Sequence, residues 1–386
     1  MLNRKLRMGM IGGGPGAFIG AVHRIAANMD GQIELVCGAF SSDPEKSKQA
    51  GELLNLPPQR VYGSYKEMIR AEKALPPDQQ MDFVSIVTPN HVHFEPAKLA
   101  LENGFHVVLD KPLTFDLKEG KQLQEIARKS GLFLCLTHTY TGYPMVKEAR
   151  QQVLSGKFGK IRKVYVEYPQ GWLSTFLEGA NNKQASWRTD PSQSGIAGSM
   201  GDIGTHAFNL AEYISGLEVT KLCADINIVV EGRKLDDDGA VLLKFNNGAS
   251  GVLMATQIAA GEENNVKIRV YGEKGGLEWK QEDNNSLIVR QPDKPIEIYR
   301  TGAAYTSSYS RHNTRVPPGH PEGYLEAFAN LYRNFAFCVK AKLAGETPEP
   351  EWLDFPGADD GVRGMNFVEK VIASGKSTEK WIDFGM

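Results

Sequence analysis

The sequence predicts an α/β fold: an N-terminal doubly wound parallel sheet, then a C-terminal α+β domain with a large, mostly antiparallel open sheet. The chain opens with a glycine-rich strand–helix–strand pattern, and its first third alternates apolar strands with helices. Later in the chain, half-buried alternating strands follow one another with short turns between them. At 386 residues, the chain is long enough for two domains with separate cores, which we place at 1–138 and 139–386.

The start of the chain holds its most informative pattern. Residues 5–11 have the pattern of an apolar strand, residues 18–26 that of a helix and residues 33–40 that of a second strand. Between the first strand and the helix, the sequence from Gly12 to Ala17 has the G-x-G-x-x-G/A spacing of a dinucleotide-binding loop. Glycine allows a tight turn and the close approach of a pyrophosphate, and Ala17 still allows the helix to pack near the strand. The N–H groups at the start of the helix then face the phosphates.

The rest of the first domain repeats this alternation. Apolar strands are predicted at 82–88, 106–110 and 133–137, with helices at 93–103 and 117–129 between them. Continuous apolar strands that are separated by helices are typical of a parallel sheet with both faces covered.

The pattern changes in the second domain. After a predicted helix at 145–154, residues 161–168 alternate apolar and polar side chains, as a half-buried strand does. Short turns such as Asn246-Asn247-Gly248 favour antiparallel pairing of the strands that follow. A sheet with one open face needs a cover, so we expect a homodimer or homotetramer that forms through this sheet. The further strands are predicted near 219–230, 239–246, 249–257, 266–271, 276–282 and 286–290.

Composition excludes several classes of protein. The 44 basic and 46 acidic residues nearly balance, and no basic block stands out, so nucleic acid is not an expected partner. No apolar run reaches the length of a membrane span, and the N-terminal apolar stretch is too short for a signal peptide, so we expect a cytoplasmic protein. Four scattered cysteines without a C-x-x-C pair indicate reduced residues rather than disulfides or metal ligands: Cys37, Cys135, Cys223 and Cys338.

The ends of the predicted parallel strands carry the residues best suited to a ligand site, because ligands bind outside the carboxyl ends of such strands. Three ends are unusual: Gly12 to Gly16, Thr88-Pro89-Asn90 and Asp110-Lys111-Pro112. Lys111 is the strongest candidate for catalysis, since a lysine there reaches the crevice beside a nicotinamide and Pro112 restricts its backbone. The alternative is a surface lysine in an ordinary strand-to-helix loop.

A second group of polar residues lies on a predicted helix of the second domain. The apolar residues there have helical spacing, and Asp202 and His206, four positions apart, project from the other face. A carboxylate beside a histidine raises its proton affinity or orients its ring, and both effects suit acid–base catalysis. The helix is expected to end at Gly216. The alternative is a solvated polar face, and a metal site is less favoured because no third ligand has a diagnostic spacing.

A third group combines aromatic and amide side chains. Tyr168, Gln170 and Trp172 lie near the end of the first alternating strand, and Trp187 and Arg188 follow after a short interval. A polyhydroxylated ring binds to flat apolar faces and to directed hydrogen-bonding groups, which these side chains supply. The alternative is a loop that its tryptophans merely pin to the sheet.

Together these motifs resemble the Gfo/Idh/MocA oxidoreductases. The glycine-rich start is followed, in order, by T-P-N-x-x-H from Thr88 to His93, an E-K-P-like tripeptide at Asp110-Lys111-Pro112, and D-x-G-x-H from Asp202 to His206. The resemblance implies a Rossmann domain, a second domain with a large mixed or antiparallel sheet, and NAD(P)-dependent oxidation of sugars, inositols or their derivatives. It points most to the inositol and sugar dehydrogenase branch, including scyllo-inositol dehydrogenase-like members. It also implies that Lys111, Asp202 and His206 lie around the nicotinamide.

The residues expected at the site form three sets. The predicted catalytic residues are Lys111, Asp202 and His206. The predicted cofactor-binding residues are Gly12, Gly13, Gly14, Gly16, Ala17, Phe18, Ser41, Ser42, Asp43, Thr88, Pro89, Asn90, His93, Asp110 and Lys111. The predicted substrate-binding residues are His138, Tyr140, Gln170, Trp172, Trp187, Arg188, Asp202 and His206.

Two positions depart from the family pattern. Asp110 stands where glutamate is usual, so whatever its carboxylate holds must lie one methylene nearer. At the end of the second strand, serine stands where an aspartate for the ribose hydroxyls is expected, and Asp43 is the candidate substitute after Ser41 and Ser42. No arginine is placed to bind a 2′-phosphate, so NAD is the expected cofactor, with NADP left open.

These inferences predict a reversible dehydrogenase that oxidises a ring hydroxyl to a ketone. His206 takes the hydroxyl proton as hydride leaves the same carbon, Asp202 orients His206 or binds a neighbouring hydroxyl, and Lys111 stabilises charge that develops on the oxygen. One rival is an NAD-dependent glycoside-cleaving enzyme that oxidises the ring transiently and expels the aglycone by elimination. Another is a nucleotide-sensing regulator without turnover, which has no need of a proton acceptor beside the nicotinamide.

Overall fold

The computed structural model describes residues 2–180 and 182–385. The chain divides into two compact units, each built on its own sheet. The first unit contains two separate stretches of sequence, Met1–Gly142 and Tyr324–Val362. The second unit contains Tyr143–Gly323 and Arg363–Met386.

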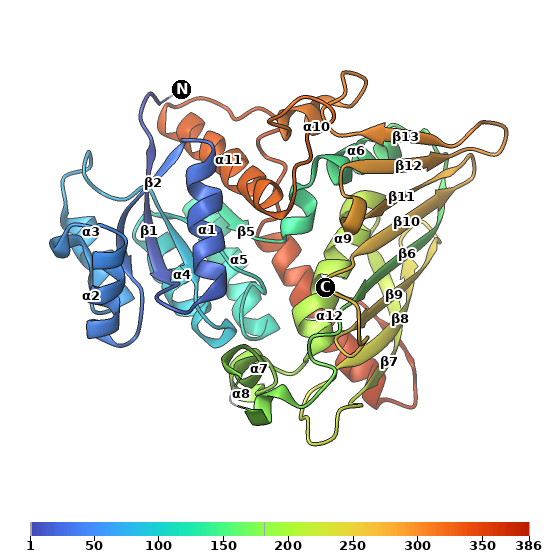
Figure 1. Cartoon of the computed structure of the whole chain (residues 1–386), viewed down its shortest axis with the longest axis horizontal. Coiled ribbons are helices and arrows are strands. Elements are labelled where there is room, and N and C mark those ends of the chain that lie inside the picture. The colour runs from blue at the N-terminus through green and yellow to red at the C-terminus, as the bar shows by residue number, and fades with distance from the viewer. Residues whose placement is uncertain (1, 181, 386) are drawn as a thin grey trace. The chain divides into compact units, whose positions relative to one another are not determined.

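The first unit is built on a five-stranded parallel sheet with the strand order β2-β1-β3-β4-β5 (Figure 1). Nearly all side chains of its strands are buried, which confirms the predicted parallel sheet with both faces covered. The strand order reverses between β1 and β3, so the carboxyl ends of these two strands mark the switch point where such folds bind ligands. The strands are β1 (Leu6–Gly12), β2 (Ile33–Ala39), β3 (Phe83–Val87), β4 (His106–Leu109) and β5 (Leu134–Leu136).

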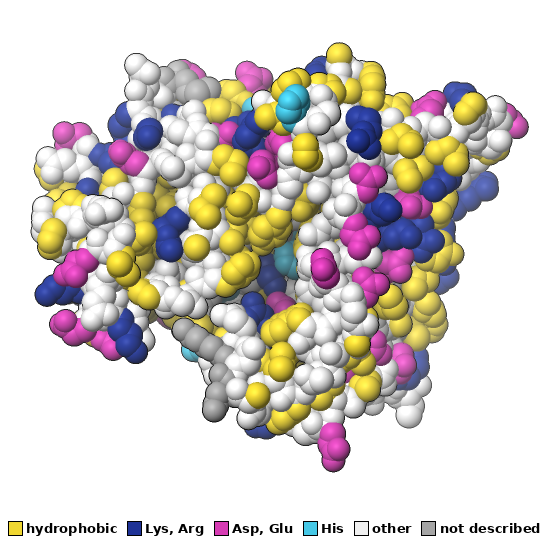
Figure 2. Space-filling model, in the orientation of Figure 1, with side chains coloured by type: hydrophobic (Ala, Val, Ile, Leu, Met, Phe, Trp, Pro, Cys, Tyr) yellow, Lys and Arg dark blue, Asp and Glu magenta, His cyan; other side chains and the backbone are white. Residues whose placement is uncertain are grey.

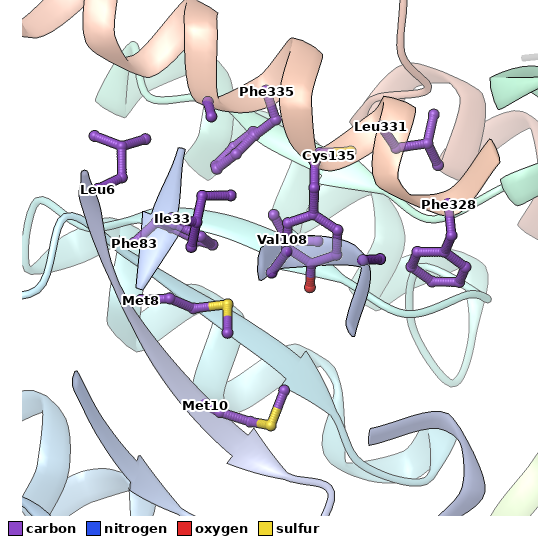
Figure 3. Packing of buried hydrophobic residues seen from close by; sticks show 14 of the residues in the cluster. Leu6, Met8, Met10, Ile33, Phe83, Val108, Cys135, Phe328, Leu331 and Phe335 are labelled. Carbon is purple, nitrogen blue, oxygen red and sulfur yellow. The ribbon is translucent and has the colours of Figure 1, made fainter. Parts of the chain in front are cut away.

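The helix α11 (Tyr324–Leu343) belongs to this first unit although it follows the second sheet in the sequence. Phe328, Leu331 and Phe335 of α11 belong to the same buried cluster as the strand side chains (Figure 3), and none of them is more than 1% exposed. Burying each such side chain contributes roughly 1.5–3 kcal/mol, so α11 is bound firmly to this sheet. The predicted boundary at residue 138 assigns α11 to the second domain, whereas the packing of α11 against the first sheet places it in the first unit. The other helices of this unit are α1 (Phe18–Met29), α2 (Pro44–Leu53), α3 (Tyr65–Ala74), α4 (Phe94–Glu102) and α5 (Leu117–Ser130).

The second unit is built on a nine-stranded sheet in the order β13-β12-β11-β10-β6-β9-β8-β7-β14 (Figure 1). Neighbouring strands pair antiparallel except β6 and β9, which are parallel, so the predicted mostly antiparallel sheet is confirmed. The edge strands β13 and β14 have four and three residues, too few for an alternation to be recognised, and were not predicted. The strands are β6 (Ile161–Pro169), β7 (Val219–Asn227), β8 (Asp238–Phe245), β9 (Ser250–Thr256), β10 (Lys267–Gly272), β11 (Gly276–Lys280), β12 (Ser286–Arg290), β13 (Glu297–Arg300) and β14 (Trp381–Asp383).

Helices cover one face of the second sheet. The helix α6 (Pro144–Leu154) packs against β11 and β12, and α9 (Thr205–Ser215) packs against β6, β9 and β10. In β6 the side chains of Val164 and Val166 are buried while that of Tyr165 is partly exposed, which is the predicted alternation. Within residues 2–180 and 182–385, no helix combines the length and hydropathy that crossing a membrane requires. The remaining helices are α7 (Lys183–Arg188), α8 (Pro191–Ser194), α10 (Ser308–His312) and α12 (Ala358–Lys376).

Candidate active site

The loop between β1 and α1 is shaped by its glycines. Gly12, Gly13 and Gly16 have φ angles of 83°, 72° and 77°, in the left-handed region that residues with a Cβ rarely adopt. Gly14 lies against the end of β2: its N–H donates to the carbonyl oxygen of Phe40 at 3.2 Å, and a Cβ on Gly14 would come within 2.8 Å of that oxygen. The loop therefore has the tight turns and bare backbone that a pyrophosphate needs, and its residues fit a dinucleotide.

The helix α1 begins at Phe18 with no side chain capping its first N–H groups and no acidic residue in its first turn. An anion can therefore accept hydrogen bonds there, at the positive end of the helix dipole. The close packing that we expected at Ala17 occurs instead at Gly20, where a Cβ would lie 2.4 Å from the Cα of Gly13. Ala17 takes the extended N-cap position. Sequence reasoning missed Gly20 because it lies beyond the G-x-G-x-x-G/A spacing.

Ser41, Ser42 and Asp43 follow β2, and Asp43 caps the next helix. Its Oδ1 accepts hydrogen bonds from the backbone N–H of Glu45 at 3.0 Å and of Lys46 at 3.4 Å. The Asp43 side chain is 47% exposed, and its Oδ2 lies 3.8 Å from the Lys46 ammonium. A negative charge therefore stands just beyond the end of β2, the region where an acid for the ribose is expected.

His93 joins the loop after β3 to the loop after β4. Its ring is wholly buried, with Nδ1 2.7 Å from the carbonyl oxygen of Pro112 and Nε2 2.9 Å from that of Thr88. Burial lowers the pKa of His93. Both ring nitrogens face backbone carbonyls, so the contacts of His93 hold the two loops together, and a direct contact with the cofactor stays a prediction. Asn90, in the same loop, is also buried, at 9% exposure.

Asp110 lies directly after β4, and its carboxylate lies beside two buried side chains. One carboxylate oxygen, Oδ1, accepts a hydrogen bond from Thr137 Oγ1 at 2.7 Å and lies 3.5 Å from Nε2 of His23 in α1. Burial acts to raise the pKa of Asp110, but the neighbouring histidine, lysine and threonine lower it by more. The pKa therefore lies well below its ordinary value, and Asp110 is charged at neutral pH. Lys111 follows Asp110 at this carboxyl edge of the sheet.

His138 and Tyr140 follow β5 and are buried, at 2% and 4% exposure. Burial and the charge of Lys111 lower the pKa of His138 to about 3, against an opposite effect of Asp110. His138 is therefore neutral at neutral pH and within electrostatic reach of Lys111. The carboxyl edge of the first sheet thus brings together the glycine loop, the two loops that His93 joins, and the residues around Lys111.

Asp202 and His206 lie in the second unit, on two different kinds of helical turn. Residues Met200–Gly204 form a π-helical turn, after which α9 runs to the predicted end at Gly216. The predicted continuous α-helix is therefore wrong. A π turn has more residues per turn than an α-helix, so the i, i+4 spacing of an α-helix does not apply to Asp202 and His206. His206 and Asn209 are 8% and 6% exposed, so the alternative of a solvated polar face is contradicted as well.

Asp236, which sequence reasoning did not identify, holds the π turn in place. Its buried carboxylate accepts hydrogen bonds from the backbone N–H of Gly198 at 2.7 Å and of Met200 at 2.8 Å, and from the Ser199 hydroxyl at 3.0 Å. Burial raises the pKa of Asp236, and these donors offset only part of that rise. Since π turns are frequent at functional sites, the turn that carries Asp202 is a candidate for a functional role.

The carboxylate of Asp202 contacts two side chains of the second unit. Its Oδ2 accepts a hydrogen bond from Gln257 Nε2 at 2.9 Å and lies 3.5 Å from Nε of Arg188. The Arg188 guanidinium in turn lies 4.3 Å from the ring centroid of Trp187 and 5.9 Å from that of Trp172. The predicted aromatic residues are therefore joined to Asp202 through a cation, which a loop pinned by its tryptophans alone would not require.

A second hydrogen-bond network lies beside His206. Gln170 Nε2 and the Tyr168 hydroxyl both donate to Asn264 Oδ1, at 2.5 Å and 2.7 Å. Trp172 Nε1 donates to Gln170 Oε1 at 3.1 Å, and the rings of Tyr168 and His206 lie 6.4 Å apart. We call the residues of the two networks the polar wall: Tyr168, Gln170, Trp172, Arg188, Asp202, His206, Gln257 and Asn264.

Gln257 and Asn264 are members of the polar wall that sequence reasoning missed. Gln257 directly follows β9, Asn264 lies in the loop before β10, and neither belongs to a recognisable motif. They come beside Gln170 because β9 and β10 flank β6 in the sheet. The available signal was only their position next to predicted strand ends.

Comparisons with known families cover both units. The family model described as an oxidoreductase family with an NAD-binding Rossmann fold matches residues 6–138, and the GFO/IDH/MocA C-terminal domain model matches residues 146–278. The uncharacterized oxidoreductase YfiI of Bacillus subtilis is 32% identical over 100% of this chain and 98% of its own. The levoglucosan dehydrogenase of Pseudarthrobacter phenanthrenivorans is 26% identical over 98% of both chains.

A solved structure agrees with these matches over nearly the whole chain. An inositol dehydrogenase homolog from Azotobacter vinelandii, crystallised with NADH and myo-inositol, superposes with a TM-score of 0.90 at 32% identity. The superposition covers 99% of this chain and 98% of that one. The resemblance drawn from the motifs is thus confirmed, as is the NAD-binding Rossmann domain. The chain belongs to the Gfo/Idh/MocA family of NAD(P)-dependent oxidoreductases.

Proposed function

We propose that the protein oxidises a ring hydroxyl of a neutral cyclic polyol, an inositol or a sugar, to a ketone by hydride transfer to NAD+. The polar wall is the observation that supports this most strongly. It offers aromatic faces, amide groups, a carboxylate and an imidazole within one unit, which a ring with several hydroxyls needs. Two relatives fit this class: one was crystallised with myo-inositol, and the other is a levoglucosan dehydrogenase.

The charges of the polar wall favour a substrate without phosphate or carboxylate groups. The positive charge of Arg188 is partly compensated, because its guanidinium lies 3.5 Å from Asp202 and stacks on Trp187. A neutral hydroxyl can donate a hydrogen bond to Asp202 while the ion pair stays intact. An anionic group would instead be repelled by that carboxylate.

The glycine loop and the start of α1 provide the cofactor site in this proposal. Gly14 and Gly16 leave the backbone bare, and the uncapped N–H groups of α1 are available to the pyrophosphate. The charge of Asp43 repels a 2′-phosphate and so favours NAD over NADP. When bound, NAD+ supplies the acceptor for the hydride.

His206 is the proposed proton acceptor. As the substrate C–H bond gives up its hydride, the O–H bond on the same carbon breaks and its proton passes to a nitrogen of the His206 imidazole. We assign Asp202 to a neighbouring hydroxyl of the ring, because its carboxylate already contacts Gln257 and Arg188. Of the two roles expected for Asp202, binding substrate is therefore preferred to orienting His206.

Lys111 is the proposed electrostatic partner of the reacting oxygen. Negative charge develops on that oxygen as its proton leaves, and a positioned ammonium group lowers the cost of that charge. The carboxylate of Asp110 is adjacent in the sequence and remains charged, so a negative charge lies beside the segment that carries this lysine.

A substrate screen with the purified protein tests this function. Inositols, free sugars, levoglucosan and aryl glycosides are each incubated with NAD+ or NADP+, and the absorbance of the reduced nicotinamide is followed. We expect net NADH formation with at least one unsubstituted cyclic polyol and a preference for NAD+. Release of aglycone from a glycoside without net NADH would instead support an elimination mechanism. Binding of NADH with no turnover in the whole panel would support a nucleotide-sensing regulator.

The open face of the second sheet is the proposed site of self-association. Leu242, Ile298 and Trp381 are 47%, 56% and 46% exposed on outward positions of β8, β13 and β14. Charged side chains of both signs gather over β10 and β11 (Figure 2), which gives this face polar contacts as well. Light scattering after gel filtration should give a dimer or tetramer for the wild type and a smaller species for Leu242→Asp. A monomeric wild type would contradict the proposal.

A reducing compartment such as the cytoplasm is the proposed location. Within the described residues the four cysteines form no disulfide with one another, and Cys37, Cys135 and Cys338 are buried. Burial raises the pKa of the Cys37 and Cys338 thiols, which makes them less reactive. The thermal midpoint should therefore be the same with and without dithiothreitol, and a large drop on reduction would argue against this location.

A further inference from the structure

We propose that two buried histidines, His23 and His93, are positioning residues that hold the backbone of Lys111 in place. This inference rests on the catalytic role proposed for Lys111. The two sequence neighbours of Lys111 are each contacted by one of these histidines: Asp110 by His23, and Pro112 by His93. We call the pair His23 and His93 the histidine clamp.

The segment that carries Lys111 needs such support from outside. Residues 111–116 form neither helix nor strand, so no regular hydrogen-bond ladder fixes them. A lysine has a long, flexible side chain, and the position of its ammonium group depends on where its backbone is held. A displacement of about 1 Å at a catalytic group costs on the order of a hundredfold in rate.

The His23 side of the clamp is a polar chain inside an apolar core. His23 is 0% exposed, with Nε2 3.5 Å from Asp110 Oδ1 and Nδ1 2.7 Å from the Tyr332 hydroxyl. Ser85 Oγ lies 2.8 Å from the same hydroxyl, and the ring of Phe328 packs edge-on at 4.7 Å from the His23 ring. Side chains of β3 and α11 thus hold the ring of His23, and this ring connects α1 to Asp110. The Nδ1 side of the ring is therefore fixed by hydroxyl groups of β3 and α11, and this leaves Nε2 facing the Asp110 carboxylate.

The His93 side of the clamp acts through backbone atoms. Its Nδ1 lies 2.7 Å from the Pro112 carbonyl oxygen, and its Nε2 lies 2.9 Å from the Thr88 carbonyl oxygen. A neutral imidazole carries one N–H, so it donates to one of these carbonyls and packs against the other. The ring thereby sets the spacing between the loop after β3 and the Lys111 segment.

His106 provides a matched control, because it is a buried histidine on the same strand but at the opposite end. It is 4% exposed, begins β4, and its Nδ1 accepts a hydrogen bond from the backbone N–H of Phe133 at 2.9 Å. Replacing it with leucine removes the polar contact of a buried histidine, as the clamp variants also do, but at the amino end of the strand. Lys111 follows the carboxyl end of β4.

The test compares His23→Leu, His93→Leu and His106→Leu in the full-length protein. Hydrogen–deuterium exchange of residues 111–116 is measured alongside urea unfolding, NADH affinity and turnover of the best polyol from the substrate screen. We expect both clamp variants to exchange faster in this segment and to lose about tenfold to a hundredfold in kcat. The control should be destabilised but keep wild-type exchange in residues 111–116 and wild-type kcat.

Two further variants of His93 separate positioning from general stability. Asparagine places an amide N–H near the Nδ1 position and retains the link to Pro112, whereas glutamine places it near Nε2 and retains the link to Thr88. His93→Asn should therefore keep more activity and slower exchange in residues 111–116 than His93→Gln. Equal behaviour of these two variants, or unchanged exchange in both clamp leucine variants, would overturn the proposal. Wild-type turnover by Lys111→Met would refute the proposed role of Lys111, and the exchange data would still decide whether the clamp holds the segment.

Discussion

The two units assemble their candidate functional residues from different materials. At the carboxyl edge of the first sheet, backbone atoms dominate: glycines in left-handed conformations, the uncapped start of α1, and the two carbonyls that His93 contacts. In the second unit, side chains dominate, and the polar wall joins amides, a carboxylate, a cation and aromatic rings. Replacing a glycine with a larger residue should disrupt a site that is made of backbone atoms. In a site made of side chains, a substitution can remove one hydrogen bond and leave the others in place.

The largest expected effects come from the proposed catalytic residue of each unit. Lys111→Met removes the ammonium group, and His206→Ala removes the proton acceptor, so each should lower kcat by more than about a hundredfold. NADH affinity, measured by fluorescence, should stay close to wild type in both. If either variant turns over at the wild-type rate, that unit does not take part in the chemistry as proposed.

Buried histidines should make the stability of the first unit depend on pH. Burial lowers the pKa of His106 to about 4 from the ordinary 6.5 that it regains on unfolding. Between these values the unfolded state binds more protons, so the free energy of unfolding falls as pH falls, by up to roughly 3 kcal/mol for this residue. Urea titrations at several pH values should give a shallower slope for His106→Gln than for the wild type. An identical slope would mean that His106 does not cause it.

Alanine substitutions at two glycines, one in each unit, test whether the glycine loop tolerates a larger side chain beside it. A Cβ on Gly20 would meet the Cα of Gly13 at 2.4 Å, whereas a Cβ on Gly364 in α12 would meet nothing within 4 Å. Gly20→Ala should therefore cost about 1–3 kcal/mol in unfolding free energy and weaken NADH binding. Gly364→Ala should be neutral or stabilise by about 0.5–1 kcal/mol, because alanine favours helix. The same result for both alanines would show that the close contact at Gly20 is not required.

A single hydrogen bond of the polar wall should have a smaller and more selective effect. Gln257→Leu removes the donor that lies 2.9 Å from Asp202 Oδ2. We expect KM for the polyol to rise by about tenfold while NADH affinity is unchanged, since one unpaired buried polar group costs about 1–3 kcal/mol. Steady-state kinetics with varied polyol measure this. A change in NADH affinity alone would place Gln257 at the cofactor instead.

The smallest expected effect concerns cofactor choice. Asp43→Asn keeps an oxygen that can cap α2 but removes the negative charge, so stability should change little and activity with NADP+ should rise severalfold relative to NAD+. Asp43→Ala also removes the cap and should cost about 1 kcal/mol more in unfolding free energy. An unchanged ratio of the two cofactors would show that the charge of Asp43 does not select between them.

The features of the fold and of the candidate site that could be predicted from the sequence are those that depend on local patterns. The glycine loop, the position of Lys111 after β4 and the end of α9 at Gly216 each depend on neighbours within a few residues. Gln257 and Asn264 depend on strand pairing across the sheet, which no local pattern reports. The same holds for the hydrogen bonds that Asp236 accepts at the start of the π turn, because Asp236 lies far from that turn in the sequence.

Isotope transfer tests the central claim most directly. A ring-deuterated polyol that is a substrate in the screen is incubated with the enzyme and NAD+, and the NADH formed is examined by mass spectrometry. Our account predicts one deuterium in each NADH and one ketone for each NADH, because the hydride leaves the carbon whose hydroxyl is oxidised. NADH without deuterium, or deuterium returned to the product with no net NADH, would contradict it.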